Sequence, residues 1–237
     1  MSLMRNSGAT LEPAMVKYGT NAEAQGAKML AYPQVFAPVM GGLVNGYVMP
    51  MLGERAVGDS LVLRQAFSKL QALWLAGARY SAGLSRCAHH TTAIVPLATD
   101  ALQRSLVDWY YRARPYDGTT ANVVHGDATL ENIMVYNGAA CWIDPSTRPM
   151  PLEVEFDVAK LLQTQLGYNG CEPETAVNEF VRSLNLRKEI LGYYLMTHLV
   201  RLYKVQLQAR VWAVEVATTL DRRLDEVLRS EETLCKS

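Results

Sequence analysis

The sequence is poor in cysteine and carries no excess of charge. Its 237 residues include four cysteines, Cys87, Cys141, Cys171 and Cys235, and none of them shows Cys-x-x-Cys spacing. This scatter argues against a zinc site and against a disulfide framework. Lysine plus arginine equals aspartate plus glutamate, at 23 each. We therefore expect no general attraction to nucleic acid or to an acidic membrane surface.

Long apolar runs and a leader pattern are also missing. No apolar run reaches about 18 residues, the shortest that would suggest a membrane span. The N-terminus lacks the charged-then-apolar pattern of a secretory signal. Together with the scattered cysteines, these absences favour a cytoplasmic location. With 49% hydrophobic residues over this length, the chain can bury a sizeable core in one or two domains.

Polar residues of one chemical kind gather around a predicted hairpin. The run HGDATLEN at 125–132 is followed by Ile143-Asp144-Pro145, and Asn137-Gly138 lies between them. Asn-Gly is a strong turn signal because both residues tolerate positive φ. A two-residue turn would place Asn132 opposite the residue before Asp144, and a three-residue loop would place it opposite Asp144 itself. Either register brings Asn132 and Asp144 close together.

Phosphoryl transfer from a nucleotide needs such a set of residues. One carboxylate, Asp127, could orient an attacking hydroxyl and accept its proton. The amide oxygen of Asn132 and the carboxylate of Asp144 could hold Mg²⁺ on the phosphates. The alternative is that these are ordinary turn residues, because Asp, Asn and Gly are common in turns. The whole constellation favours phosphoryl transfer.

These motifs resemble those of the aminoglycoside phosphotransferase-like branch of the protein-kinase-like fold. That branch includes antibiotic, choline, methylthioribose and fructosamine kinases. Its catalytic loop, H-G-D-x-x-x-x-N, is matched by His125, Gly126, Asp127 and Asn132. Its metal motif, I-D-P, is matched around Asp144. The resemblance implies an α+β, bilobal protein-kinase-like fold, with a small mixed lobe over residues 1–53 and a larger helical lobe over residues 54–237.

The resemblance also implies supporting roles near the catalytic loop. His125 would shape the loop by hydrogen bonds to nearby backbone rather than act as the base. Asp157 follows in the D-x-A-x-L pattern of the family and would support the loop by hydrogen bonding, without doing chemistry. Equally, Asp157 could be an ordinary first-turn acid favoured by the helix dipole.

Upstream, the resemblance implies a nucleotide site. Lys17, on a strand expected over 13–18, looks like the phosphate-binding lysine. Glu23, on a helix expected over 21–30, looks like the carboxylate that aims that lysine. Asn21 is the expected N-cap of this helix. The alternative makes Lys17 a solvated strand residue and Glu23 a first-turn acid favoured by the helix dipole.

Residues 44–53 resemble the hinge between the lobes, where Met49 and Met51 would meet adenine. Methionines make good walls for a flat ring, although each could equally be plain core. The implied cofactors are ATP or GTP with Mg²⁺, and the implied partner is a small molecule that offers a hydroxyl. The segment after Asp144 lacks an A-P-E-type activation element.

The lobe before Lys17 is short. Only sixteen residues precede it, and no G-x-G-x-x-G is present there. Residues 1–5 could form one strand and residues 6–8 a turn into the Lys17 strand. Two alternatives to a stand-alone kinase follow. One is a catalytically weak, kinase-like regulator that binds a nucleotide or metabolite, and the other is an interaction module, with a homodimer or partner completing the lobe.

The remaining chain shows mostly helical periodicity. Helices are expected over 59–77, 96–113, 157–166 and 172–184, and two more over 186–229 with a break near 208–212. Adjacent His89 and His90 are poor joint metal ligands because neighbouring side chains diverge. His198 and Arg201, three apart on a helix, could face a substrate or form a partly buried polar pair. Arg148 could touch phosphate or substrate, or be solvated in its loop.

Overall fold

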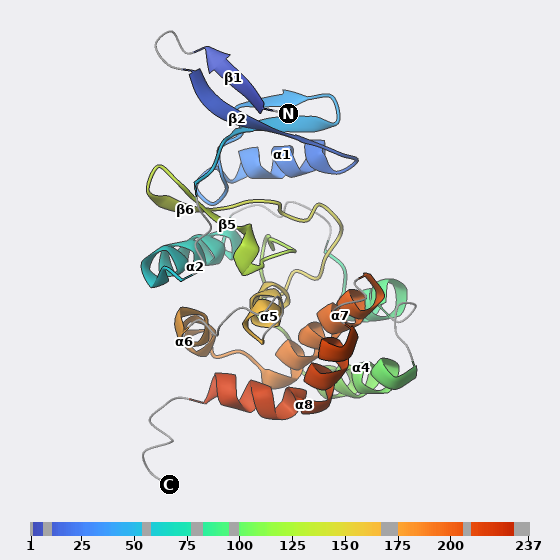
Figure 1. Ribbon diagram of the computed structural model, residues 1–237. Helices are drawn as coiled ribbons and strands as arrows, with labels where there is room; N and C mark the ends of the chain where they lie inside the picture. The colour runs from blue at the N-terminus through green and yellow to red at the C-terminus, as the bar shows by residue number, and fades with distance from the viewer. Residues whose placement is uncertain are drawn as a thin grey trace.

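A small lobe containing a sheet lies over a larger helical lobe (Figure 1). The structure, a computed structural model, describes residues 2–6, 11–53, 58–76, 83–94, 100–166, 175–205 and 210–229. The α+β, bilobal architecture expected from the sequence is confirmed. The expected boundary after residue 53 meets residues 54–57, which lie outside the described part, so the division stays a prediction. None of the described helices has the length and apolar character needed to cross a bilayer.

Four antiparallel strands form the sheet of the small lobe, in the order β1-β2-β4-β3. Their bounds are β1 Ser2–Asn6, β2 Leu11–Tyr18, β3 Gly41–Leu43 and β4 Gly46–Pro50. β1 and β2 correspond to the expected strands at 1–5 and 13–18, and the turn expected at 6–8 lies mostly outside the described residues. β3 and β4 turn at Val44 and Asn45, and Asn45 has a φ of 58°. Gly46 follows because a Cβ there would lie 2.5 Å from the Lys17 carbonyl oxygen.

The predicted hairpin forms between the two lobes. β5 (Ile133–Tyr136) pairs with β6 (Ala139–Trp142), and Asn137 and Gly138 make the turn with φ of 49° and 74°. This is the two-residue register, which places Asn132 opposite Ile143. The Ile143 N–H donates to the Asn132 carbonyl at 3.0 Å. Local turn chemistry therefore brings Asn132 beside Asp144.

One helix, α1 (Ala22–Ala31), belongs to the small lobe, and the other helices make up the larger lobe (Figure 1). The bounds of these are α2 Ser60–Trp74, α3 Arg86–Ala88, α4 Asp100–Ala113, α5 Val154–Gln165, α6 Thr175–Ser183, α7 Lys188–Val205 and α8 Arg210–Leu228. The break between α7 and α8 contains residues 206–209, which are outside the described part. α2 begins where the sequence predicts, because the Asp59 carboxylate accepts hydrogen bonds from two N–H groups of its first turn, at 3.0 and 3.1 Å.

α5 is the central helix of this lobe. It begins at Val154, three residues before the predicted start at Asp157. Lys160 is the one residue of α5 that is not buried. A helix buried on all sides is shielded by its neighbours, and here α7 and α6 pack against it. The exception at Lys160 marks the side of α5 that faces a cavity.

His89 and His90 are packed in the core, in a π-helical stretch His89–Ile94. The His89 ring meets the ring of Phe156 edge-on, with centroids 5.6 Å apart, and His90 stacks on Tyr110 at 4.0 Å. Neither nitrogen of His89 has a hydrogen-bond partner among the described residues. Burial lowers the pKa of His89 to about 4, and the charge of Arg201 adds to that effect. His89 is therefore neutral near pH 7.

Replacing His89 by leucine should flatten the acid limb of the stability curve. Below pH 6.5 the unfolded chain binds a proton at this position, whereas the folded protein does so only near pH 4. The free energy of unfolding thus falls as the pH falls. The change in the free energy of unfolding caused by His89→Leu should be about 2 kcal/mol more stabilising at pH 5 than at pH 7, measured by urea unfolding. A core change without a titrating group, Leu199→Met, should change the free energy of unfolding by the same amount at pH 5 and at pH 7. An equal change at the two pH values for His89→Leu would contradict a buried, neutral histidine.

Candidate active site

The catalytic-loop motif is held from below by a buried carboxylate. Asp157, on α5, accepts hydrogen bonds from the backbone N–H groups of His125 and Gly126, both at 2.7 Å. It also accepts one from the Trp74 indole at 2.9 Å. Burial raises the pKa of Asp157, and the three donors and the nearby Lys28 charge act against that rise. The structure thus places Asp157 where it can support the loop.

An ammonium group holds the same loop from the other side. Lys28, on α1, is 4% exposed, and its Nζ donates to the carbonyl oxygens of Val124 and Ser146, both at 2.8 Å. A longer bond of 3.4 Å reaches the His125 carbonyl. Burial lowers the pKa of Lys28 to about 8, and the Asp157 charge acts against that fall. Lys28 is not among the residues predicted from the sequence, because nothing local distinguishes it from a solvated helix lysine.

His125 fixes the shape of the loop through both ring nitrogens. Its Nε2 lies 3.0 Å from the Ile143 carbonyl, and its Nδ1 accepts from the Asp127 N–H at 3.3 Å. This pattern requires the neutral ring with the proton on Nε2. Burial lowers the pKa of His125 to about 3, and the Lys28 charge adds to that effect. His125 is fully buried, so it is placed to orient Asp127 rather than to meet a ligand.

Asp127 and Asn132 lie together at the end of the loop. The Asn132 side-chain amide donates to the Asp127 backbone carbonyl at 2.8 Å, and a longer contact of 3.4 Å reaches the Asp127 carboxylate. Both contacts use the amide nitrogen of Asn132, so its amide oxygen is the atom left to act as a ligand. The Asp127 carboxylate, whose side chain is 46% exposed, lies 3.1 Å from Lys160 Nζ. Lys160, a second residue missed from the sequence, thus provides a charge beside the proposed base.

Asp144 stands opposite Asp127 in an unusual backbone conformation. Its φ is 57°, in the left-handed region that Asp tolerates better than most residues. Its carboxylate contacts Lys17 Nζ. The expected ion pair between Lys17 and Glu23 is not formed, because Lys17 pairs with the Asp144 carboxylate instead. Glu23 is exposed in the first turn of α1.

The other predicted nucleotide contacts differ in accessibility. Met49 is 2% exposed and belongs to the core, whereas Met51 is 55% exposed. The adenine contact stays a prediction for both, and in this conformation only Met51 offers surface to a ligand. Asn21 sits at the N-cap position of α1, but its side chain makes no capping hydrogen bond. It lines a cavity with Gln25 instead.

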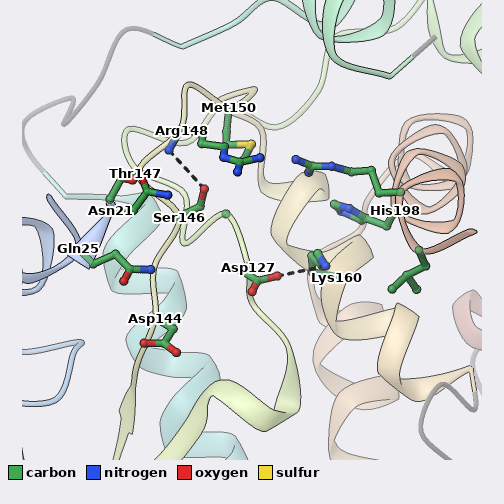
Figure 2. A pocket seen from close by; sticks show the side chains of 13 residues that line it. Asn21, Gln25, Asp127, Asp144, Ser146, Thr147, Arg148, Met150, Lys160 and His198 are labelled. Atoms are coloured by element: carbon green, nitrogen blue, oxygen red, sulfur yellow. Dashed lines mark hydrogen bonds and ion pairs between the residues drawn. The ribbon is translucent and has the colours of Figure 1, made fainter. Parts of the chain in front are cut away.

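This cavity of about 320 Å³ is lined by two of the predicted site residues, Asp127 and Asp144 (Figure 2). The other residues predicted to bind nucleotide or metal, or to support the loop, are not part of its lining. Figure 2 shows Asp127 between Asp144 on one side and Lys160 and His198 on the other. Residues from the loop after Asp144, from α5 and from α7 complete the wall. The lining residues are Asn21, Gln25, Gly126, Asp127, Asp144, Ser146, Thr147, Arg148, Met150, Lys160, His198, Arg201 and Leu202. The volume suits a small molecule.

The ligand set at the hairpin fits a magnesium ion. A carboxylate from Asp144 and an amide oxygen from Asn132 are hard oxygen donors, which Mg²⁺ prefers. Within the described part of the chain, no group of three or more His, Cys, Asp or Glu side chains could hold a metal. An ion at Asn132 and Asp144 would therefore take its remaining ligands from phosphate and water, as Mg²⁺ commonly does.

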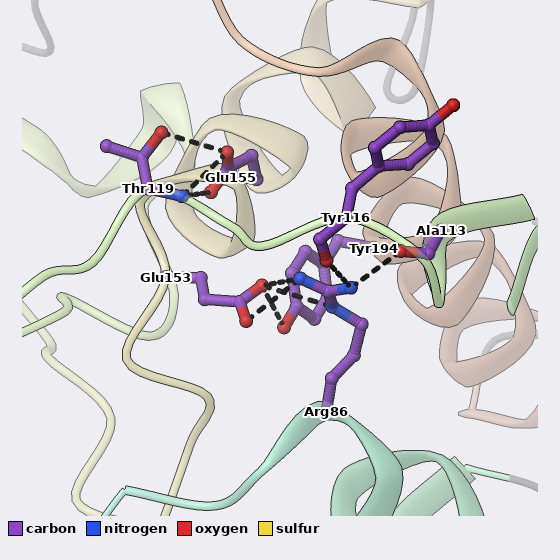
Figure 3. A network of polar contacts seen from close by, with 7 residues as sticks. All are labelled: Arg86, Ala113, Tyr116, Thr119, Glu153, Glu155 and Tyr194. Atoms are coloured by element: carbon purple, nitrogen blue, oxygen red, sulfur yellow. Dashed lines mark hydrogen bonds and ion pairs between the residues drawn. The ribbon is translucent and has the colours of Figure 1, made fainter.

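A polar network anchors the start of α5, which carries Asp157 and Lys160 (Figure 3). Arg86 donates to both carboxylate oxygens of Glu153, at 2.9 and 3.0 Å, and to the carbonyl of Ala113. The Tyr194 hydroxyl donates to the same carboxylate at 2.9 Å. This network joins α3, α4 and α7 to the residue just before α5.

Comparisons with known proteins identify the fold. No family model matches the sequence, and neither does any curated protein. A solved protein from Thermobifida fusca assigned as a fructosamine-3-kinase matches with a TM-score of 0.66 at 17% identity, over 94% of this chain and 93% of the other. A choline/ethanolamine kinase family protein from Mesorhizobium loti gives 0.58 at 14% identity, over 98% and 89%.

A third match is spectinomycin phosphotransferase in complex with ADP and spectinomycin. Its TM-score is 0.58 at 13% identity, over 92% of this chain and 84% of the other. Identities this low establish the fold alone. The chain has the protein-kinase-like fold that these small-molecule kinases share, as the resemblance of the loop motifs implied.

Gly126 should be the glycine of the site least able to gain a side chain. Its φ is 84°, and a Cβ there would lie 2.6 Å from the Ser146 Cβ. Gly138 is a matched control with a φ of 74° and open space around it. Both alanine variants should lose about 1 kcal/mol to the left-handed backbone. Gly126→Ala should lose a further 1 to 3 kcal/mol, roughly, to the clash. Equal unfolding free energies in urea would contradict this close approach.

The Glu153 network should matter far more than an exposed ion pair. Glu153→Gln leaves the half-buried Arg86 guanidinium without its counter-charge, and we expect a loss of about 3 kcal/mol. Glu179→Gln removes the exposed pair with Arg64, whose side chains are 45% and 62% exposed. That loss should stay below about 1 kcal/mol. Chemical denaturation of both variants measures the difference, and similar losses would show that the Arg86 network does not anchor α5.

Proposed function

We propose that this protein is a small-molecule kinase that transfers the γ-phosphoryl group of ATP or GTP to a hydroxyl, with Mg²⁺. The observation that carries the proposal is the arrangement at the cavity. Asp127 faces the cavity beside Asn132, and Asp144, which follows β6, lines the same cavity. Lys17 reaches Asp144 from the small lobe. The protein-kinase-like fold supports this assignment, because kinases of this fold use such a set for phosphoryl transfer.

Asp127 acts on the acceptor in this mechanism. Its carboxylate is partly exposed to the cavity, so it can accept a hydrogen bond from the acceptor hydroxyl and orient its oxygen for in-line attack. The proton passes to Asp127 as the bond from the hydroxyl oxygen to the γ-phosphorus forms, while the bond from that phosphorus to the bridging oxygen breaks and the nucleoside diphosphate leaves. Lys160 Nζ, 3.1 Å from the same carboxylate, keeps a positive charge close to Asp127 while that carboxylate accepts the proton. His125 keeps Asp127 oriented through the Asp127 N–H.

The nucleotide phosphates would lie between the lobes. Lys17 would exchange its contact with Asp144 for one with a phosphate. This exchange frees the Asp144 carboxylate, which with the Asn132 amide oxygen would hold Mg²⁺. When bound, the ion neutralises charge on the phosphates. The ADP bound to spectinomycin phosphotransferase, a structural relative, supports nucleotide use here, and exposed Met51 remains a candidate contact for the base.

One observation favours a second function, that of a kinase-like regulator with little turnover. In this conformation Lys17 contacts Asp144. The lysine proposed to bind phosphate and the carboxylate proposed to bind metal are therefore paired with each other. A protein that kept this pair would bind nucleotide weakly or without metal. Nucleotide titration separates the two functions, because only the kinase needs the pair to open.

Titration calorimetry with ATP and with GTP, each with and without Mg²⁺, tests the proposal. Wild type should bind one nucleotide in a Mg²⁺-dependent manner, and Asp144→Ala should weaken that binding at least about tenfold. Asp127→Asn should keep nucleotide binding but lower turnover by about 10² to 10⁴-fold, measured as nucleoside diphosphate release in a screen of hydroxyl compounds.

Asp108→Asn provides the control, because Asp108 lies on α4 with its side chain 68% exposed. It should leave both binding and turnover unchanged. Binding that needs no Mg²⁺, or that survives Asp144→Ala, would favour the regulator. The absence of binding by either nucleotide at millimolar concentration would reject a stand-alone kinase and direct attention to a partner or second copy that completes the small lobe.

A further inference from the structure

The cavity wall carries more basic than acidic side chains. Arg148, Lys160 and Arg201 line it together with two acids, Asp127 and Asp144. Each acid already contacts a lysine, Asp127 through Lys160 and Asp144 through Lys17 from the small lobe. The two guanidinium groups therefore remain without a carboxylate partner. They come from separate segments, the loop after Asp144 and helix α7.

These two arginines lie close enough to repel each other. Burial and the positive charge of Arg148 both lower the pKa of Arg201, against the attraction of Asp127. No hydrogen bond or ion pair of either guanidinium is found within the described ranges. By contrast, the half-buried Arg86 and Arg112 each hold a carboxylate, at 2.9 and 2.6 Å. The two guanidinium groups in the cavity thus repel each other without an ion-pair partner among the described residues, and a bound anion would relieve that repulsion.

The neighbouring histidine adds no positive charge to this end of the cavity. His198 is fully buried, and its Nε2 lies 3.2 Å from the Phe156 carbonyl. Burial lowers its pKa well below the usual range, and the charges of Lys160 and Arg201 add to that effect. His198 is thus a neutral wall of the cavity, and the arginines define the charge of this end.

Building on the proposed function, we infer that the phosphoryl acceptor is an anionic small molecule. Its hydroxyl would meet Asp127, and its phosphate or carboxylate group would be held by Arg148 and Arg201. The planar fork of a guanidinium matches both groups in geometry, with two parallel N–H···O bonds. An acceptor bearing several ammonium groups would instead face like charge at this end of the cavity. The cavity therefore selects by charge as well as by size.

Thermal unfolding with simple anions tests this site without a known acceptor. The probes are inorganic phosphate and acetate, compared with chloride at equal ionic strength. The melting temperature with each anion is measured with and without a non-hydrolysable analogue of the nucleotide that binds. The analogue is added as its Mg²⁺ complex, so that the γ-phosphate position is already filled. At an anion concentration of about ten times Kd, the melting temperature should rise by about 3 °C beyond chloride. Phosphate acting alone indicates a phosphorylated acceptor, and acetate acting as well indicates a carboxylate.

Variants assign the effect to the two arginines. Arg148→Gln and Arg201→Gln should each lose the anion-dependent rise, and Arg222→Gln, on an exposed part of α8, should keep it. Arg148 lies on the exposed rim of the cavity, so its variant should fold even if the half-buried Arg201 variant does not. Arg201→Lys, which retains the charge but not the fork, should show an intermediate rise.

The outcomes separate this inference from the function on which it rests. No rise beyond chloride would overturn it. A rise that disappears when the analogue is bound would also overturn it, because the arginines would then serve the γ-phosphate. If no nucleotide binds but phosphate still stabilises wild type and not Arg148→Gln, the anion site stands and the kinase proposal fails.

Discussion

The site depends on one short loop held between two buried charges of opposite sign. Asp157 takes N–H groups of the loop from one side, and Lys28 takes its carbonyl groups from the other. Both charges are desolvated, a cost that hydrogen bonds and their mutual attraction must offset. Because Lys28 belongs to α1 and Asp157 to α5, the pair also joins the two lobes at the loop. The loop can carry exposed acids only because its backbone is fixed from beneath.

The same arrangement explains why the residues of the site differ so much in burial. His125 and Asp157 are fully buried and set backbone positions. Asp127 is half exposed and faces the cavity. Asp144 sits in a left-handed conformation at the end of the hairpin, a strained geometry that the surrounding hydrogen bonds maintain. A rigid base thus presents a small number of groups that remain free to meet a ligand.

Electrostatics divides the cavity into two functional ends. On the side of the small lobe, Lys17 and Asp144 neutralise each other and can separate to take phosphate and metal. On the side of α7, Arg148 and Arg201 form no ion pair with any of the described residues. The proposed function draws on the first end and the inferred acceptor charge on the second. Asp127, with Lys160, stands between them, where the reacting atoms would meet.

The sequence by itself determined what depends on neighbours along the chain. Asn137-Gly138 indicated the hairpin through local φ preferences but left two registers open, apolar periodicity placed most of the described helices, and the loop motif indicated Asp127, Asn132 and Asp144. Tertiary structure alone decided the partners of charges. The Lys17–Asp144 contact joins residues 127 apart, and Lys28 meets Val124 across 96. A charge selects its partner by distance in space and by burial, and neither quantity is written in local sequence.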